Sequence, residues 1–347
     1  MRGEVLADVP IKVVAIGGGT GLSTLLKGLK HFDQPGVFSA PGSRHDVFIN
    51  GLTAIVTVTD DGGSSGRLRK EFNILPPGDI RNCMVALSED EELLSQLFQY
   101  RFKSGAGLEG HNFGNLFLAA LTAITGDFAM AVKLSSAILK SRGIIYPSTV
   151  SNVELEALMD DGSCVRGETS ISRSKQRIVE LYMIPPDAQP LPQALEAIAE
   201  ADLITLGPGS LYTSLISNLI VSGIPQAIKA SAAVKIFVCN LMTQANESLG
   251  LSAADHLRAL QDHAKTQLFD YALVNTRPVS AELKEKYAAE GAEQIAVDLE
   301  EIRRMGVEPV CGDFLEEAGV ARHATDTLAR ALLNLTVSSQ RSTISNG

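Results

Sequence analysis

The sequence predicts a doubly wound α/β fold with a mostly parallel sheet. A β-branched run, Ile11–Ile16, leads into the glycine-rich turn Gly17–Gly21, and leucines then recur at i, i+3, i+4 and i+7 from Leu22. Strand, glycine turn and helix in this order open a doubly wound domain. Composition agrees, because 30 glycines, 5% aromatic residues and no tryptophan favour layers joined by tight turns over an all-β sandwich.

Later segments continue the alternation of strands and helices. The stretch 31–51 holds two prolines and is expected to be a loop. Alternating apolar residues in 153–159 and the turn signal Asp160-Asp161-Gly162 indicate a hairpin, so 145–186 is expected to be a small β-rich insertion. Within it, strands are expected at 153–159, 165–172 and 178–184. Outside it, strands are expected at 53–59, 202–206, 234–239, 271–275, 294–297 and 308–310, and helices at 79–87, 91–102, 112–124, 191–201 and from 325.

Length and charge bound the domain organisation and the partners. The 347 residues, 45% hydrophobic and 20% charged, fit one large α/β domain over 1–336. The remaining 337–347 are expected to form a disordered tail. The net charge of −10 argues against nucleic-acid binding, which needs a basic face.

Cysteine spacing and hydropathy point to a cytoplasmic protein. The four cysteines are scattered without a CxxC pair, so neither a zinc site nor a disulfide framework is expected. The N-terminal residues lack the apolar stretch of a signal peptide. No segment reaches the ~20 apolar residues of a membrane span.

Three small-residue loops, each after a predicted strand, are the main functional signal. In a parallel sheet the carboxyl ends of the strands share one edge, where ligands bind. Glycine lets backbone N–H groups approach a phosphate, and a following helix adds the positive end of its dipole. The loops Gly17–Gly21, Gly62–Gly66 and Gly207–Ser210 therefore predict a phosphate-bearing ligand. They supply the candidates Gly18, Gly19, Thr20, Gly21, Gly63, Gly207, Pro208, Gly209 and Ser210.

Two common nucleotide motifs are absent. A GxGxxG register beginning at Gly17 or Gly19 fails, because Leu22 and Thr24 stand where the last glycine should be. No Gly-Lys-Ser/Thr follows, so a Walker P-loop is excluded as well. NAD-dependent hydride transfer and P-loop hydrolysis are therefore disfavoured.

The segment around the second loop carries the richest chemistry. Asp60 and Asp61 end a strand, where carboxylates bind ribose hydroxyls or, through water, a Mg²⁺ ion that bridges phosphates. The hydroxyls of Ser64 and Ser65 suit phosphate oxygens, and Arg67 offers a charge-assisted pair. The competing interpretation is a solvated turn whose acids offset the neighbouring bases.

Other polar residues follow strands or begin helices. Asp79 is either a helix N-cap or a ligand contact, and Asn82 lies in the same first turn. Lone histidines are more often structural than functional, yet one at a helix start beside asparagine and glycine is placed for a ligand. Arg322 and His323 precede the last helix and are either a surface pair or ligand contacts. The remaining candidates, placed to hydrogen-bond a sugar or base, are His111, Asn115, Asn240, Thr243 and Asn275.

No motif for a reaction centre accompanies these residues. The sequence contains no HExxH, no DxDxDG metal loop, no GxSxG turn and no evident Cys/His nucleophile pair. It indicates a binding site for phosphates more clearly than a catalytic one.

Long stretches of the chain resemble one family. They are VVAIGGGTGLSTLLKGLK, TAIVTVTDDGGSSGRLRKEFNILPPGDIRNCMVAL, HNFGNLFLAAL, LGPGSLYTSLISNLIVSGI and NLMTQANES. These motifs resemble the YvcK-type gluconeogenesis factor family of the CofD-like superfamily, whose other branch contains the 2-phospho-L-lactate transferases. The resemblance implies a Rossmann-like CofD fold, UDP-sugar binding, and a role in cell shape and cell-wall precursor supply on gluconeogenic carbon sources.

On this sequence the resemblance assigns the diphosphate to Gly17–Gly21 and Gly207–Ser210. Asp60 and Asp61 would then lie near the nucleotide or its Mg²⁺. Two functions compete: a regulator that binds a UDP-sugar without consuming it, and a CofD-like phosphotransferase that uses a nucleotide-activated donor. The transferase branch shares GGTG and the Asp pair but lacks the extended GGSSGRLRKEF run, which favours the regulator. The identity of a regulatory protein partner is left open, and a homo-oligomer is compatible with the sequence.

Overall fold

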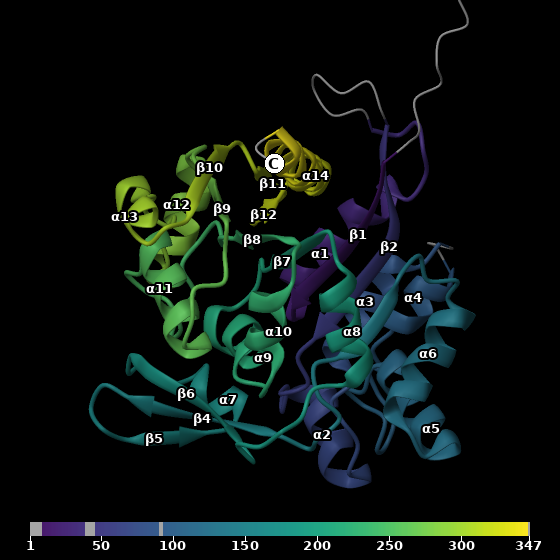
Figure 1. Cartoon of the computed structure of the whole chain (residues 1–347). Helices are drawn as coiled ribbons and strands as arrows, with labels where there is room; N and C mark the ends of the chain where they lie inside the picture. Colours follow the sequence, from purple (N-terminus) through teal and green to yellow (C-terminus); the bar gives the residue numbers. More distant parts are fainter. Residues whose placement is uncertain (1–8, 39–45, 90–92, 346–347) are drawn as a thin grey trace, which may run out of the picture.

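A seven-stranded sheet forms the centre of the computed structural model, which describes residues 9–38, 46–89 and 93–345 (Figure 1). All neighbouring strands are parallel, and their order is β10-β9-β8-β7-β1-β2-β3. The predicted doubly wound α/β fold is therefore confirmed. Its strands are β1 (Val9–Gly17), β2 (Val47–Val56), β3 (Ile144–Pro147), β7 (Leu203–Leu206), β8 (Val234–Val238), β9 (Tyr271–Asn275) and β10 (Glu308–Gly312).

The chain leaves the middle of this sheet in two directions. From β1 it proceeds outward to β2 and β3, and it later returns to β7, on the other side of β1, before adding β8, β9 and β10. The carboxyl ends of β1 and β7 thus flank the point where the strand order reverses, which is the usual ligand position in such sheets. Both strands are apolar and buried, as central parallel strands must be.

Helices surround the sheet. The leucines from Leu22 to Leu29 are fully buried on α1, which packs against α3 and α14, while α8 packs against α10. The helices are α1 (Gly19–Leu29), α2 (Gly63–Phe72), α3 (Gly78–Leu87), α4 (Leu93–Gln99), α5 (Phe113–Thr125), α6 (Phe128–Ile138), α7 (Glu168–Ile171), α8 (Pro192–Glu200), α9 (Ser217–Leu219), α10 (Ile224–Ala230), α11 (Ala253–Ala264), α12 (Ala281–Ala288), α13 (Leu299–Arg304) and α14 (Thr325–Ser345), with a 3-10 turn η1 (Lys30–Phe32) and a π-helical segment η2 (Leu211–Ile216).

A three-stranded antiparallel sheet projects below the main body (Figure 1). It consists of β4 (Glu154–Met159), β5 (Cys164–Arg166) and β6 (Ile178–Ile184), so a small β-rich insertion is present. Two details differ from the prediction. The strand expected at 165–172 ends at Arg166 and gives way to α7, and residues 144–147 belong to the main sheet as β3.

Three further expectations are wrong. Residues 294–297 form no strand, because the segment beside them is the loop after β8 and only Gln294 and Met242 form an isolated bridge there. The expected loop 31–51 contains the first half of β2, in which Val47 and Ile49 are buried; residues 39–45 lie outside the described residues. The expected tail 337–347 is helical as far as Ser345, since α14 continues and Val337 packs on the core; residues 346–347 are outside the described part.

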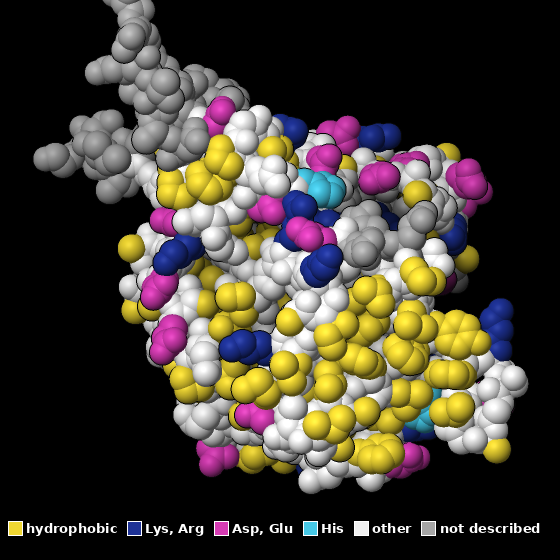
Figure 2. All heavy atoms as spheres, turned by 90° about the vertical axis from the view of Figure 1, so that its right-hand side faces the viewer, with side chains coloured by type: hydrophobic (Ala, Val, Ile, Leu, Met, Phe, Trp, Pro, Cys, Tyr) yellow, Lys and Arg dark blue, Asp and Glu magenta, His cyan; other side chains and the backbone are white. Residues whose placement is uncertain are grey.

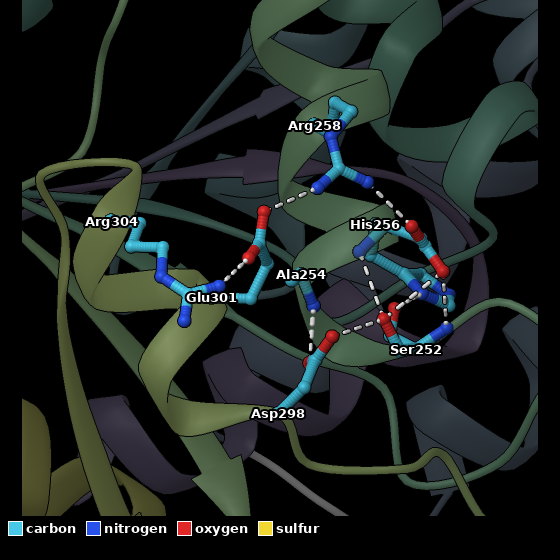
Figure 3. A network of polar contacts seen from close by, with 8 residues as sticks. Ser252, Ala254, His256, Arg258, Asp298, Glu301 and Arg304 are labelled. Atoms are coloured by element: carbon cyan, nitrogen blue, oxygen red, sulfur yellow. Dashed lines mark hydrogen bonds and ion pairs between the residues drawn. The ribbon is translucent and has the colours of Figure 1, made fainter.

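A polar network fastens α11 to the start of α13 (Figure 3). Ser252 caps α11, and the carboxylate of Asp298 accepts hydrogen bonds from the Ser252 hydroxyl at 2.6 Å and the Ala254 N–H at 2.9 Å. Farther along, Glu301 accepts from Arg258 and Arg304. These bonds satisfy N–H groups that a helix start leaves unpaired, so the network is structural.

Among the described residues, no single helix is both long and apolar enough to cross a membrane. One bent pair, Leu211–Leu219 with Ile224–Ala230, has the length and composition, and its first part is buried in the core.

Candidate functional site

A cavity of about 350 Å³ lies where the loops after β1 and β7 meet, at the reversal of strand order. The loop after β8 and the short strand β12 (Ala321–His323), which pairs with β11 (Leu315–Glu317), complete its wall. We call it the large cavity. Ten predicted residues line it: Gly18, Gly19, Thr20, Gly21, Pro208, Gly209, Ser210, Asn240, Thr243 and Arg322.

The two glycine loops touch one another. A Cβ atom on Gly21 would lie 2.4 Å from the carbonyl oxygen of Pro208, so only glycine permits this approach. Asn240 fixes the loop after β7, because its Oδ1 accepts from the Gly209 N–H at 3.0 Å and its Nδ2 donates to the Gly209 carbonyl at 2.6 Å. The amide of Asn240 therefore shapes the loop that borders the cavity.

Backbone N–H groups at the start of α1 border the large cavity. Gly18 is the N-cap and offers no side chain to the first turn, and Gly19 has φ +61°, a conformation suited to glycine. A helix N-terminus without a side-chain cap is a favourable place for an anion.

The C-terminal wall adds one cation. Arg322 is exposed on β12, and within the described residues its side chain makes no ion pair or hydrogen bond. Its neighbour His323 is buried, and its Nε2 donates to the carbonyl of Cys239 at 3.1 Å. Burial lowers the pKa of His323 to about 4, so this ring is neutral near pH 7.

A second cavity, of about 240 Å³, lies among the N-termini of α2, α3 and α5. We call it the small cavity. Seven predicted residues line it: Asp60, Gly63, Ser64, Ser65, Asp79, Asn82 and Asn115. Arg81 and Arg101 line it too, so the small cavity contains both cations and carboxylates.

Buried polar atoms in the small cavity lack partners. Asn115 is buried; its Nδ2 donates to the Ser65 hydroxyl at 3.4 Å, but its Oδ1 has no partner among the described residues. The same holds for Nε of Arg81, whose Nη2 donates to Asn82. Burial, together with the nearby positive charge of Arg101, lowers the pKa of Arg81. Polar groups in such positions satisfy their hydrogen bonds through a ligand or water.

Asp79 stands between the two cavities. A Cβ atom on Gly18, in the large cavity, would lie 2.8 Å from Oδ2 of Asp79, which lines the small one. Burial raises the pKa of Asp79 to about 6, against the opposing effect of the Gly19 N–H that donates to it; the charge of Asp60 raises it further. The carboxyl group of Asp79 thus lines the small cavity and lies next to Gly18 of the large one, beside the side chain of Thr57.

The insertion contributes a third carboxylate to this region. Glu168, on α7, accepts a hydrogen bond from the Thr59 hydroxyl at 3.2 Å. Burial raises the pKa of Glu168 well above its usual value, and the charges of Asp60 and Asp79 add to the effect. Asp60 and Asp79 are therefore close enough to Glu168 for their charges to affect its pKa. In the described part of the chain, however, no three His, Cys, Asp or Glu side chains form a metal-binding group.

Five predicted residues line neither cavity. Asp61 accepts from the N–H and hydroxyl of Thr169, whereas Asp60 accepts from the Gly62 N–H and alone lines a cavity. Arg67 donates to the Glu109 carbonyl, and His111 hydrogen-bonds the Ser64 hydroxyl from a buried position. Each of these side chains has an intramolecular partner. The other two are Asn275, which bonds the backbone of Arg277 and Phe314, and Gly207, which forms a turn with φ +87°.

Sequence reasoning did not select several lining residues. Arg81 and Asp79 share a helical turn, so the pattern at Asp79 was a signal for Arg81. Arg101 reaches the small cavity from beyond α4, and its Nη1 donates to the Gly110 carbonyl; nothing local marks it. In the large cavity, Thr24 and Ser214 lie in the helical segments that follow the two predicted loops, and Gln244 and Tyr287 come from other parts of the chain.

Comparison with known proteins places this architecture in a family. The family model for 2-phospho-L-lactate transferase CofD matches residues 13–315. The chain belongs to the CofD family. This CofD-family chain is 48% identical over 322 residues to the gluconeogenesis factor of Halalkalibacterium halodurans, covering 92% of this chain and 95% of that protein. It is 45% identical to the gluconeogenesis factor of Bacillus subtilis, covering 93% and 98%.

A solved structure agrees with this CofD-family assignment. The crystal structure of a Bacillus halodurans protein superposes with a TM-score of 0.87 at 47% identity, covering 93% of this chain and 99% of that one. A second crystal structure from the same organism, described as a member of the UPF0052 family, gives a TM-score of 0.86 at 47% identity. The Rossmann-like CofD fold is therefore confirmed.

Proposed function

We propose that this protein is a gluconeogenesis factor that binds a nucleotide sugar of the UDP-sugar type and releases it unchanged. The observation that carries the proposal is the large cavity, because two glycine loops, a helix N-terminus and the cation of Arg322 converge on it. Backbone N–H groups and one arginine are suitable partners for a diphosphate. Relatives of nearly the same length are named gluconeogenesis factor.

The adjoining small cavity supports a ligand longer than a nucleotide alone. Its unpaired Asn115 Oδ1 and Arg81 Nε are suited to hydroxyl groups of a sugar, and it lies next to the large cavity at Gly18. In this proposal the diphosphate occupies the large cavity and the sugar extends past Asp79. The protein then reports the supply of cell-wall precursors on gluconeogenic carbon sources and thereby supports cell shape.

A transferase is the second candidate function. The family model carries the name of a transferase, and Asp79, with a pKa of about 6, is a carboxyl group able to exchange a proton near neutral pH. Transfer of a phosphorus-containing group depends mainly on positioning and charge stabilisation, so it requires no protein nucleophile. Asp60 would supply an oxygen ligand to Mg²⁺ in that case, without Asp61, which faces Thr169.

Calorimetric titration tests the proposed ligand. The protein is titrated with UDP-GlcNAc, UDP-glucose, GDP and NAD, each with and without Mg²⁺. We expect the UDP-sugars to bind most tightly, and Arg322→Ala to weaken them about tenfold, as loss of one charge-assisted hydrogen bond does. The matched control is Arg304→Ala, an exposed arginine paired with Glu301 away from both cavities. Equal binding by wild type and Arg322→Ala would contradict the assignment.

Recovery of the ligand separates the two candidate functions. UDP-GlcNAc is incubated with the protein and Mg²⁺ and then quantified by chromatography. Full recovery supports the regulator, whereas steady conversion that stops in Asp60→Asn shows that the site transfers a group of the ligand to water, and it rules out release of the ligand unchanged. Tight binding of GDP with Mg²⁺ in the calorimeter would likewise favour the transferase and direct the search to an acceptor.

A further inference from the structure

Two arginines in the small cavity have no ion-pair partner. Arg81, on α3, is buried, and its Nη2 donates to the side-chain oxygen of Asn82. Arg101 donates from Nη1 to the carbonyl of Gly110. Among the described residues, neither guanidinium forms an ion pair with a carboxylate, although both line the same cavity. Charged groups inside proteins are normally paired, so this arrangement calls for an anion from outside the chain.

The stem of Arg81 is held in one place. It passes Gly114, where a Cβ atom would lie 2.9 Å from Cδ of Arg81 and 2.7 Å from the carbonyl oxygen of Phe98, so only glycine leaves room for it. Nε of Arg81 has no partner in the described part of the chain. A fixed guanidinium with an unused donor is suited to an acceptor on a ligand.

Two helix starts add backbone N–H groups to the same cavity. Gly62 is the N-cap of α2 and Pro77 is the N-cap of α3, and neither provides a side-chain hydrogen bond to the first turn. Both helices are 10 residues long, and their first residues, Gly63 and Gly78, line the cavity. N–H groups in a first turn lack a partner within the helix and favour a negative charge in front of them.

The neighbouring helices α4, α5 and α6 offer these arginines almost no carboxylate. They lie on the right-hand side in Figure 1, and Figure 2, which turns this side to the viewer, shows mostly hydrophobic side chains over it. The segment 93–99 contains no charged residue. The segment 113–138 contains only Lys133 and Asp127, whose carboxylate caps α6. This side of the molecule therefore leaves the charges of Arg81 and Arg101 to a ligand.

The acceptors of the small cavity suit a different kind of ligand group. Asp60, Asp79 and the unpartnered Oδ1 of Asn115 accept hydrogen bonds, so they fit the hydroxyl groups of a sugar. A hydroxyl group needs no guanidinium. A carboxylate or a phosphate, by contrast, takes strong and often bidentate hydrogen bonds from arginine. Hydroxyl groups and an oxyanion together match the full set of groups in the cavity.

We propose that the small cavity binds an oxyanion, either a carboxylate or a phosphate, in addition to the diphosphate in the large cavity. Arg81 and Arg101 hold this oxyanion in front of the starts of α2 and α3. Two sources supply the same chemistry: an acidic group on the sugar of the nucleotide sugar, and a free phosphate ion beside a neutral sugar. The first source rests on the proposed function, and the second does not.

Two UDP-sugars that differ in one group test the first source. UDP-glucuronate carries a carboxylate at C6 where UDP-glucose carries a hydroxymethyl group, and the full chain is titrated calorimetrically with each. We expect UDP-glucuronate to bind about tenfold more tightly, and Arg101→Ala to bring the ratio of the two affinities close to one. Arg101→Lys keeps the charge without the planar fork and retains part of the preference. The control is Arg304→Ala, which keeps the wild-type ratio because Arg304 pairs with Glu301 away from both cavities.

Inorganic phosphate tests the second source. The protein is titrated with sodium phosphate, alone and in the presence of UDP-glucose, at constant ionic strength. Binding that weakens about tenfold in Arg101→Ala and stays at the wild-type level in Arg304→Ala assigns a free phosphate to the small cavity. Arg81→Gln, which keeps a donor without the charge, is the second variant, and thermal melting verifies that each variant is folded. Arg101 is exposed and follows α4, so its replacement is expected to leave the fold intact.

Three results would overturn the proposal. In the first, UDP-glucose binds at least as tightly as UDP-glucuronate, and phosphate binds either to no protein or equally to wild type and Arg101→Ala. In the second, a preference for UDP-glucuronate persists in both Arg101→Ala and Arg81→Gln. In the third, phosphate binding is lost in Arg322→Ala alone, which places the ion in the large cavity. If no UDP-sugar binds, the proposed function fails, whereas the phosphate titration still decides whether the small cavity takes an oxyanion.

Discussion

Asp79 combines a stability cost with a position at the centre of the candidate site. Its carboxyl group is buried between the two cavities, where burial raises its pKa from 3.8 to about 6. The unfolded chain releases this proton above pH 4, whereas the folded chain keeps it until about pH 6. Stability is therefore lost as the pH rises through this window, and the full cost remains at pH 8.

Replacing Asp79 with asparagine removes that cost. The amide keeps an oxygen to accept the Gly19 N–H but cannot ionise, so we expect a gain of up to about 3 kcal/mol at pH 8 and only about 0.5 kcal/mol at pH 4. Urea unfolding at both pH values measures it, with the exposed Asp187→Asn as control. A gain of the same size at pH 4 would contradict the ionisation argument. A stabilised variant that no longer binds UDP-sugar would mark Asp79 as a functional residue.

At the scale of elements, the crossing of the β1 and β7 loops determines the shape of the large cavity. Gly21→Ala places a methyl group 2.4 Å from the Pro208 carbonyl, so the loops must separate. We expect a loss of roughly 1–3 kcal/mol of stability together with weaker UDP-sugar binding. Thermal melting and calorimetry measure the two effects. In Gly51→Ala the nearest atom is Cγ of Lys12 at an ordinary 3.5 Å, so that control is expected to behave like the wild type.

The elements also show what the sequence can predict. An apolar β-branched run buried on both faces identifies a central strand, and β9 matches its predicted range of 271–275. The segment 294–297 has similar local preferences, but it lies beside the loop after β8, where only Gln294 and Met242 form a bridge, and no local pattern contains that information. The end of α14 was missed because Val337, which packs on the core, is followed mainly by serines and other polar residues with little helical preference.

The site was predictable to the extent that it follows strand ends. The loops after β1, β2 and β7 lie along one edge, which the order of strands and loops predicts. Directions of side chains were not predictable: Asp60 and Asp61 are adjacent, yet only Asp60 lines a cavity, because Thr169 of the insertion takes the other carboxylate. The place of Arg101 in the small cavity was not predictable either, because it depends on the fold of a segment without motifs.

At the scale of the whole molecule, the last part of the chain returns to the centre of the sheet. Strand β12 brings His323 to the end of β8, where its neutral ring donates to the Cys239 carbonyl, and α14 then packs on α1. Gly28 allows that contact, because a Cβ there would lie 2.4 Å from the carbonyl oxygen of Thr325. The segment that completes the wall of the large cavity thus leads directly into the helix that packs against α1, the first helix of the domain.

Acid is expected to weaken the contact between β12 and the end of β8 through His323. Its pKa is about 4 in the folded chain against 6.5 in the unfolded one, so below pH 6.5 the unfolded chain binds a proton that the folded chain does not. Stability is then lost as the pH falls, by about 2 kcal/mol between pH 7.5 and 5 from this group alone. His323→Gln can still donate to Cys239 but does not titrate, so its urea midpoint should fall less over the same range. His31→Gln, an exposed histidine paired with Asp326, should keep the wild-type slope. Parallel pH profiles for wild type and His323→Gln would show that the imidazole is not buried in its neutral form, and the closure of the C-terminal wall would then need another explanation.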